Sequence, residues 1–410
     1  MTSTTLNGAS SRAVDFRIIG LVGSAHFVSH IYILILPPLF PFLRAEFGVS
    51  YTELGAAIAL FNVLSAALQT PAGYLVDRTS ARTVLVGGLV LGAASLLAAS
   101  MAPNFILFTL MFAVLGIANT VYHPADYALL STRISTARTG QAFSIHIFAG
   151  FIGTAITPAV MLLLAASFGW RGAFVAGALL GVAVAVAIVV FGGVLAGREA
   201  AHAKTAADAG ASGGDRRILM TMPVILNLFF FMLIACVSVG TQNYAIVALG
   251  ALWGTPLPEA ATALTVYLTF SAFAVLAGGI LASRTARHDL VAMIGLAASG
   301  VALLPVAFID FNMALLIGLM AVSGFFNGLI QPSRDMIVKA VTPPGAFGRV
   351  FGFVTTGFNI GGIVAPPIFG YMMDHGAPHI VILATALCSL AAIPTVMITV
   401  AHGAQKDRLA

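Results

Sequence analysis

The residues of this sequence that could do chemistry are a few polar side chains placed at helical spacing inside long apolar stretches. His26 and His30 stand four residues apart, a spacing that puts both rings on one face of a helix. Imidazoles there could hydrogen-bond within a cavity, carry protons near neutral pH or chelate a metal ion. These three roles are the alternatives for the pair. Because no third metal ligand is evident, chelation is the least favoured of them, and we predict no metal site.

Two apolar segments carry matching stripes of polar residues. The stripes are Asn119, Tyr122, His123 and Asp126 in the first segment and Asn327, Gln331 and Arg334 in the second. A shift of 208 residues superposes the second stripe on the first. Ionisable groups inside a membrane usually face a cavity or a partner. We therefore expect both stripes to line one cavity with the histidine pair and with other polar residues of apolar segments, namely His146, Gln242, Asn243 and Asn359.

The composition requires that these residues lie in a membrane. Of the 410 residues, 60% are apolar and 8% are charged, whereas soluble proteins have about 25% charged residues. A spanning helix needs about 20 residues, so the chain could build roughly twelve. The spans must be helices rather than a barrel, because lipid offers the backbone no hydrogen-bond partner and the apolar runs are continuous. The sequence excludes a soluble domain and predicts an all-α polytopic membrane protein.

Twelve apolar runs are long enough to span a membrane. They cover residues 18–42, 53–76, 83–102, 104–130, 141–166, 172–195, 222–249, 259–281, 290–308, 311–335, 349–372 and 379–400. The longest polar interruption predicts a cytoplasmic linker, 196–221, between an N-terminal six-helix half, 1–195, and a C-terminal six-helix half, 222–410. With both termini cytoplasmic, all of the 19 Lys and Arg residues except Arg44 and Arg171 lie on or near the cytoplasmic side. We therefore expect a multi-pass protein of the cell (inner) membrane in this orientation.

The two halves also repeat in sequence. The same shift carries Gly116 and Pro124 onto Gly324 and Pro332, and it carries five residues of the next helix onto identical residues. Parallel repeats of this kind are typical of two-half transporters, whose binding site lies near the midplane between the halves. An ATP-driven pump is disfavoured because the chain has no phosphate-binding loop. The only collection of side chains that could serve a membrane-embedded enzyme is the histidine pair together with His123 and Asp126. We predict a transporter instead, with no catalytic residues.

Asp126 and Arg334 occupy equivalent positions in the two stripes. Symmetry-related residues can meet across a twofold axis, so we expect an ion pair that helps to close the cytoplasmic side. Protonating Asp126, or offering Arg334 an anionic substrate, would weaken this closure. Asp126 and His30 are the expected proton-coupling residues. Alternatively, Asp126 and Arg334 lie at the inner ends of their helices and reach water or lipid headgroups.

The loop after the second run carries a motif. It reads Gly73-Tyr74-Leu75-Val76-Asp77-Arg78-Thr79-Ser80-Ala81-Arg82. This motif resembles the loop signature of the major facilitator superfamily. The resemblance implies twelve helices in two pseudo-symmetric six-helix halves, and a gating role for Gly73, Asp77 and Arg78. The alternative is a positive-inside loop with an incidental acid.

Three further stretches resemble the fosmidomycin-resistance branch of that superfamily, a group of drug exporters. They cover residues 26–32, 122–126 and 144–158. The branch usually has an acid at the position of His30, and the superfamily's common arginine of the fourth helix corresponds to Phe112 here. The resemblance implies export, and these departures leave uptake open.

The sequence therefore predicts a secondary active transporter that exports a drug or metabolite by alternating access and is coupled to protons. The alternative is proton-coupled uptake or exchange of an organic anion such as a carboxylate, with Arg334 as its contact. We expect a monomer whose partners are a small-molecule substrate, protons and the lipid bilayer, with no cofactor. Basic residues are scattered rather than gathered in a patch, so nucleic acid is not an expected partner.

Overall fold

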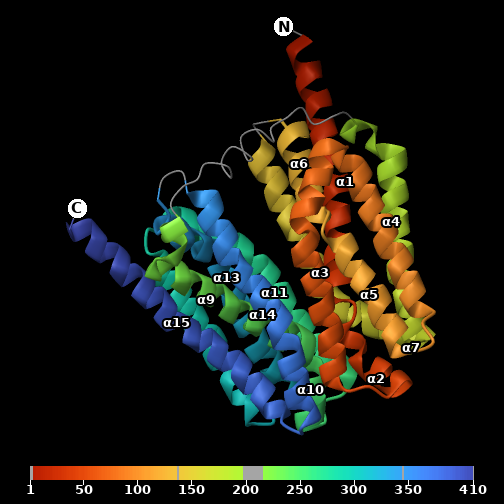
Figure 1. Ribbon diagram of the computed structural model, residues 1–410, viewed down its shortest axis with the longest axis vertical. Helices are drawn as coiled ribbons and strands as arrows, with labels where there is room; N and C mark the ends of the chain where they lie inside the picture. Colours follow the sequence, from red (N-terminus) through yellow and green to blue (C-terminus); the bar gives the residue numbers. More distant parts are fainter. Residues whose placement is uncertain (1–2, 136–137, 197–215, 344–345, 410) are drawn as a thin grey trace. The chain divides into compact units, whose positions relative to one another are not determined.

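The computed structural model describes residues 3–135, 138–196, 216–343 and 346–409, and every regular element within these ranges is a helix. The helices before the predicted linker are α1 (Ser3–Leu34), α2 (Phe40–Phe47), α3 (Tyr51–Arg78), α4 (Ala81–Ser100), α5 (Phe105–Asn119), α6 (Tyr122–Arg133) and α7 (Thr139–Phe191). Those after it are α9 (Met222–Val239), α10 (Ala245–Trp253), α11 (Leu257–Arg284), α12 (His288–Leu303), α13 (Met313–Ala340), α14 (Phe347–Asp374) and α15 (Pro378–Leu409) (Figure 1). A π-helix, Gly240–Tyr244, joins α9 to α10.

Eleven segments of the described chain are long and apolar enough to cross a membrane. The longest, Thr139–Leu195, has 57 residues, nearly three times the roughly 20 residues of one span. Gly169 interrupts it with a φ of 71°, a left-handed value that glycine adopts without strain. Divided at Gly169, the segment supplies two spans, an assignment that agrees with the twelve apolar runs. The predicted all-α polytopic fold is confirmed.

The chain forms two compact units. The first consists of Met1–Leu43 and Leu60–Ala203, and the second of Arg44–Ala59 and Lys204–Ala410. Helix α3 is therefore shared, because it begins in the second unit and continues from Leu60 in the first. Residues 197–215 of the predicted linker lie outside the described residues. The division into halves 1–195 and 222–410 stays a prediction.

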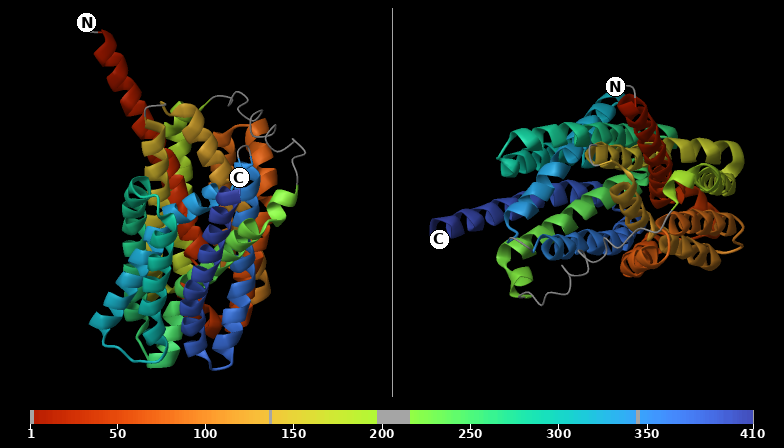
Figure 2. Two further views of the ribbon diagram at one scale, coloured as in Figure 1. Left: turned by 90° about the vertical axis from the view of Figure 1, so that its left-hand side faces the viewer. Right: turned by 90° about the horizontal axis from the view of Figure 1, so that it is seen from above.

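Each unit is a bundle of long helices that pack along one another. In the first unit, α1 and α4 both pack on α7, and α4 also contacts α5 and α6. In the second unit, α11 packs on α13, α9 lies against α14 and α15, and α12 contacts α13 and α15. Figure 2 shows the helices of each unit from two further sides. Large buried side chains fill the spaces, among them Tyr32, Phe108 and Phe174 in the first unit and Phe230 and Tyr267 in the second.

Gly116 and Gly324, one pair of repeated glycines, lie where two helices make backbone contact. A Cβ atom added to Gly116 of α5 would lie 2.5 Å from the carbonyl oxygen of Phe61 in α3. The equivalent Gly324 of α13 faces the carbonyl of Tyr267 in α11 in the same way. Small residues allow backbones this close inside a membrane. The repeat therefore preserves helix packing within each unit.

The helix starts repeat as well. Asn104 precedes α5, and its side-chain oxygen accepts a hydrogen bond of 2.9 Å from the backbone N–H of Leu107. Asn312, 208 residues later, caps α13 through Leu315 at 3.0 Å. An asparagine at this position satisfies one of the four N–H groups that a helix start leaves unpaired.

Two aspartates tie loops to helices. Asp15 of α1 accepts hydrogen bonds from the hydroxyl of Ser135 and from Arg138, each 2.7 Å long. In the second unit, Asp374 at the end of α14 caps the start of α3. It accepts hydrogen bonds from the backbone N–H groups of Tyr51 and Thr52, both 2.8 Å, and from the Thr52 hydroxyl, 2.6 Å. A carboxylate at a helix N-terminus also interacts favourably with the helix dipole.

Candidate functional site

Five ionisable side chains of the first unit meet in its interior, and we call them the histidine cluster. They are His26 and His30 of α1, His123 and Asp126 of α6, and His146 of α7. The rings of His26 and His146 stack with centroids 3.7 Å apart. The ring of His26 also lies 4.6 Å from that of His30 and 5.2 Å from that of His123. Four of the nine histidines of the chain therefore gather in one place.

Asp126 lies at the buried side of the cluster with none of its surface exposed. Its Oδ2 atom is 3.4 Å from Nδ1 of His26 and 3.9 Å from Nε2 of His146. Neither carboxylate oxygen has a hydrogen-bond partner. Burying a carboxylate without a partner is costly in a medium of low dielectric constant. The cluster is therefore suited to hold a proton or another cation beside Asp126.

Gly150 of α7 makes room for the rings. A Cβ atom at this position would lie 2.7 Å from Nε2 of His30 and 2.8 Å from Nε2 of His26. One turn later, the hydroxyl of Thr154 is 2.8 Å from Nδ1 of His30 and holds that ring by a hydrogen bond. Thr154 was not among the predicted site residues. Its position four residues after Gly150, on the same helix face, is the signal that could have indicated it.

The first predicted stripe is divided in the structure. Asn119 is the last residue of α5 and Tyr122 is the first of α6. Pro124 has no N–H to offer the carbonyl four residues earlier, but the equivalent Pro332 lies inside the unbroken helix α13, so the proline alone does not account for the break. Asn119 donates a hydrogen bond of 2.9 Å to Ser65 of α3, outside the histidine cluster. Tyr122 is buried, and its hydroxyl is another buried atom without a hydrogen-bond partner.

The second stripe lies on the unbroken helix α13. Asn327 is buried, and Gln331 donates a hydrogen bond of 3.4 Å to its backbone carbonyl. Arg334 donates from Nε to Asp335 at 2.9 Å, and its guanidinium lies 4.6 Å from the centroid of Phe231. Arg334 thus has partners within its own unit, and an ion pair between Asp126 and Arg334 stays a prediction.

The other predicted cavity and gate residues are half-buried or exposed. Gln242 and Asn243 belong to the π-helix and are half-buried, and Asn359 of α14 is exposed. Among the proposed gate residues, Asp77 and Arg78 are exposed at the end of α3. A Cβ atom at Gly73 would meet nothing within 4 Å. The cavity and gating roles of these residues stay predictions.

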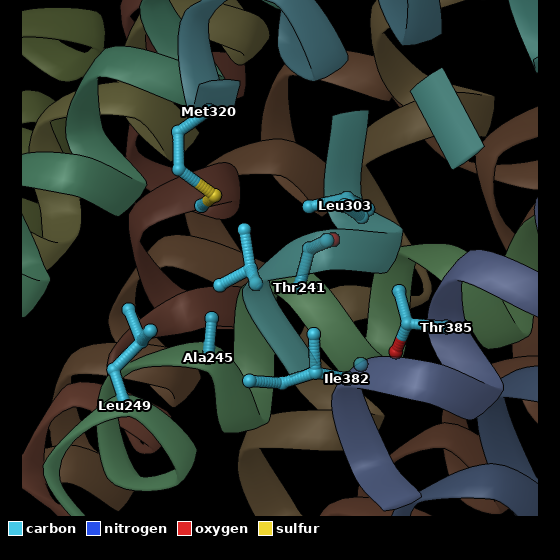
Figure 3. Close-up of a pocket in the computed structure, with 9 residues that line it drawn as sticks. Thr241, Ala245, Leu249, Leu303, Met320, Ile382 and Thr385 are labelled. Atoms are coloured by element: carbon cyan, nitrogen blue, oxygen red, sulfur yellow. The ribbon is translucent and has the colours of Figure 1, made fainter. Parts of the chain in front are cut away.

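A small cavity lies within the second unit beside the π-helix (Figure 3). Its volume is about 20 Å³, enough for one water molecule. Its lining residues are Gly240, Thr241, Ala245, Leu249, Leu303, Val306, Met320, Ile382 and Thr385. The two threonine hydroxyls donate to carbonyls of their own helical segments, Thr241 to Val237 and Thr385 to Val381, each at 2.7 Å. An organic substrate does not fit here.

Known proteins resemble this chain along nearly its whole length. The family described as Major Facilitator Superfamily matches residues 22–252 and 228–408. The fosmidomycin resistance protein of Escherichia coli (strain K12) is 23% identical over 395 residues, which cover 94% of this chain and 93% of that protein. The probable sulfoacetate transporter SauU of Cupriavidus necator (strain ATCC 17699) is 25% identical over 391 residues, 87% of each chain.

The fold is also similar to that of solved transporters. A bacterial homolog of the human lysosomal transporter Spinster, crystallised in an inward-facing and occupied conformation, superposes with a TM-score of 0.75. The superposition covers 95% of this chain and 96% of that one at 14% sequence identity. At this level of identity, the likeness concerns the fold alone.

Proposed function

The chain belongs to the Major Facilitator Superfamily of membrane transporters, and we propose that it exports a small drug or metabolite across the cell (inner) membrane, by alternating access, in exchange for protons. Export is supported by the similarity, along 94% of the chain, to a protein named for fosmidomycin resistance. The proposed orientation has both termini in the cytoplasm, and the proposed functional form is a monomer.

The buried carboxylate of Asp126 is the observation that carries the coupling. It lies among histidines with neither oxygen hydrogen-bonded, and a membrane protein that keeps such a group usually uses it. Asp126 and His30 are therefore the proposed coupling residues. The proposed gate comprises Gly73, Asp77 and Arg78, together with the Asp126–Arg334 pair.

Proton exchange can be measured in proteoliposomes that contain a pH-sensitive dye. We expect added fosmidomycin to change the internal pH only in vesicles that contain the protein, because each transported drug molecule is exchanged for a proton. Asp126→Asn keeps the side-chain shape but removes the carboxylate, and should reduce the pH change to that of protein-free vesicles. Asp310→Asn, at an exposed loop position, is the matched control. Drug flux without proton movement in the wild type would disprove the coupling.

A second candidate is proton-coupled uptake or exchange of an organic anion. It is supported by the similarity to a probable sulfoacetate transporter along 87% of the chain and by Arg334, whose side chain is 15% exposed. A guanidinium can bind a carboxylate or sulfonate through paired hydrogen bonds. In this case Arg334 is the proposed anion contact.

Thermal-shift measurements distinguish the two candidates. Sulfoacetate should raise the melting temperature of the purified protein if the substrate is an anion, and Arg334→Ala should weaken its binding by about 10- to 100-fold, the loss expected for a hydrogen bond to a charged group. Arg287→Ala is the control, because Arg287 pairs with Asp289 at the surface and its side chain is 64% exposed. Stabilisation by fosmidomycin but not by sulfoacetate would favour the drug as the substrate and exclude this anion.

A further inference from the structure

The histidine cluster contains more unsatisfied polar atoms than a buried site normally keeps. Six buried atoms have no hydrogen-bond partner: Nδ1 of His26, Nδ1 of His123, both ring nitrogens of His146 and both carboxylate oxygens of Asp126. Most buried polar atoms in proteins are hydrogen-bonded, so a concentration of unpaired atoms suggests an absent partner. Each of these four side chains can offer an electron pair to a metal ion, one ring nitrogen for each neutral imidazole, and they come from three helices.

We propose that His26, His123 and His146 bind one divalent transition-metal ion, with Asp126 as the charged partner of the site. Ring nitrogens of the three histidines all lie within 4.8 Å of one another. Nitrogens bound to one zinc ion at about 2.0–2.1 Å are roughly 3.4 Å apart in tetrahedral geometry. Binding would therefore draw the nitrogens closer together, through reorientation of the imidazole rings.

The donor chemistry selects the class of ion. Imidazole nitrogen suits Zn²⁺, Cu²⁺, Ni²⁺ and Co²⁺, whereas Mg²⁺ and Ca²⁺ require a majority of oxygen ligands. Three histidines with one further position for a carboxylate or water form a typical zinc coordination set. The positive charge of the ion would also offset the buried charge of Asp126, which has no basic residue within ion-pair distance other than His26 and His146 among the described side chains.

Asp126 has a second task in such a site. Its Oδ2 atom lies 3.4 Å from Nδ1 of His26, close enough to orient that ring so that its other nitrogen faces the ion. Carboxylates behind ligating histidines commonly have this role. The space for the rings depends on Gly150, since an added Cβ would lie 2.8 Å from Nε2 of His26. His30 is held by Thr154 and is not one of the proposed ligands.

The ion would connect α1, α6 and α7, the helices that carry the three ligands. Occupancy should therefore stabilise the first unit against unfolding, because a ligand that binds only the folded state raises its stability. This effect does not depend on whether the ion is transported, is exchanged with a proton or stays bound.

The test uses the full-length protein in detergent, purified through a tag without histidines and treated with a chelator. Zn²⁺ alone is the probe, titrated by calorimetry, and Co²⁺ is titrated in parallel because its visible absorption bands report nitrogen ligands and tetrahedral geometry. We expect one Zn²⁺ per chain with submicromolar affinity and a higher melting temperature. Wild-type protein that binds no stoichiometric Zn²⁺, or that gives the Co²⁺ spectrum of the aqueous ion, would overturn the proposal.

Variants locate the site. Losing an outer-shell partner typically lowers metal affinity roughly 10- to 100-fold. His146→Gln removes a ligand, so it should lower the affinity for Zn²⁺ by more than this. For Asp126→Asn, the loss of Zn²⁺ affinity should fall within that 10- to 100-fold range. His402→Gln, at an exposed position of α15, should bind Zn²⁺ like the wild type. If His146→Gln does not fold, Gly150→Ala keeps every ligand and should still weaken binding. Unchanged affinity in folded His146→Gln and Gly150→Ala would contradict the site.

These measurements separate the metal site from the proposed transport function. Zn²⁺ binding is measured in detergent without any flux, so its absence would leave proton-coupled export untouched. Conversely, a protein that binds Zn²⁺ but moves no fosmidomycin would keep the metal site and lose that transport proposal.

Discussion

Replacing Gly328 with alanine is expected to destabilise the protein by about 1–3 kcal/mol, the range for forcing extra atoms into a packed interior. Gly328 lies on α13, and an added Cβ would overlap the backbone carbonyl of Ser271 in α11. A backbone atom cannot rotate out of the way as a side chain can. Helices α11 and α13 would have to separate along their contact, and the melting temperature in detergent should fall.

The same helix provides the control. Gly318 also lies on α13, but a Cβ there would meet nothing within 4 Å. Alanine is favoured over glycine in a helix by up to about 1 kcal/mol, so Gly318→Ala should leave the melting temperature unchanged or raise it. Equal decreases in both variants would show that the α11–α13 contact is not as close as described.

The Asp374→Ala variant is expected to lower stability by up to about 2 kcal/mol, the upper range for losing a helix N-cap. Three hydrogen bonds between Asp374 and the start of α3 would be lost. Two of the donors are backbone N–H groups, which have no intrahelical acceptor at a helix start. The melting temperature of the purified protein measures the loss.

Two further variants separate the cap from a general charge effect. Asp374→Asn keeps one acceptor oxygen and should lose less stability than Asp374→Ala. Asp310→Ala removes the same charge from an exposed loop and should be near neutral, as surface substitutions usually are. An Asp310→Ala effect as large as that of Asp374→Ala would attribute the result to net charge instead of the cap.

The helical fold could be predicted because it follows from local chemistry. A continuous apolar run must form a helix in lipid, whatever its neighbours are. The shift of 208 residues also indicated equivalent packing positions before their contacts were known, and Gly116 and Gly324 both proved to face a carbonyl of a neighbouring helix. Breaks within apolar runs, such as those after Leu34 and after Asn119, were not predicted, since hydropathy does not register local changes in helix geometry.

The site could be predicted only in part. The spacing of His26 and His30 indicated a shared helix face, but His30 bonds to Thr154 while His26 stacks on His146. No spacing along the chain relates His26 of α1 to His146 of α7, because only tertiary packing brings these helices together. For the same reason, a third metal ligand could not be found from the sequence. Gln242 and Asn243 fall in a π-helix, where the 3.6-residue period no longer assigns a face.

The shared helix α3 has a consequence for experiments that divide the chain. A cut within 196–221 yields a C-terminal fragment without residues 44–59, although these residues belong to the second unit. In that fragment, the carboxylate of Asp374 would lose its hydrogen bond from the backbone N–H of Tyr51, and the backbone of Gly370 would lose its contact with Tyr51. The fragment is therefore incomplete as a folding unit. Separately expressed halves should accumulate only when both are made in the same cell, so that the N-terminal polypeptide supplies the missing first turns of α3.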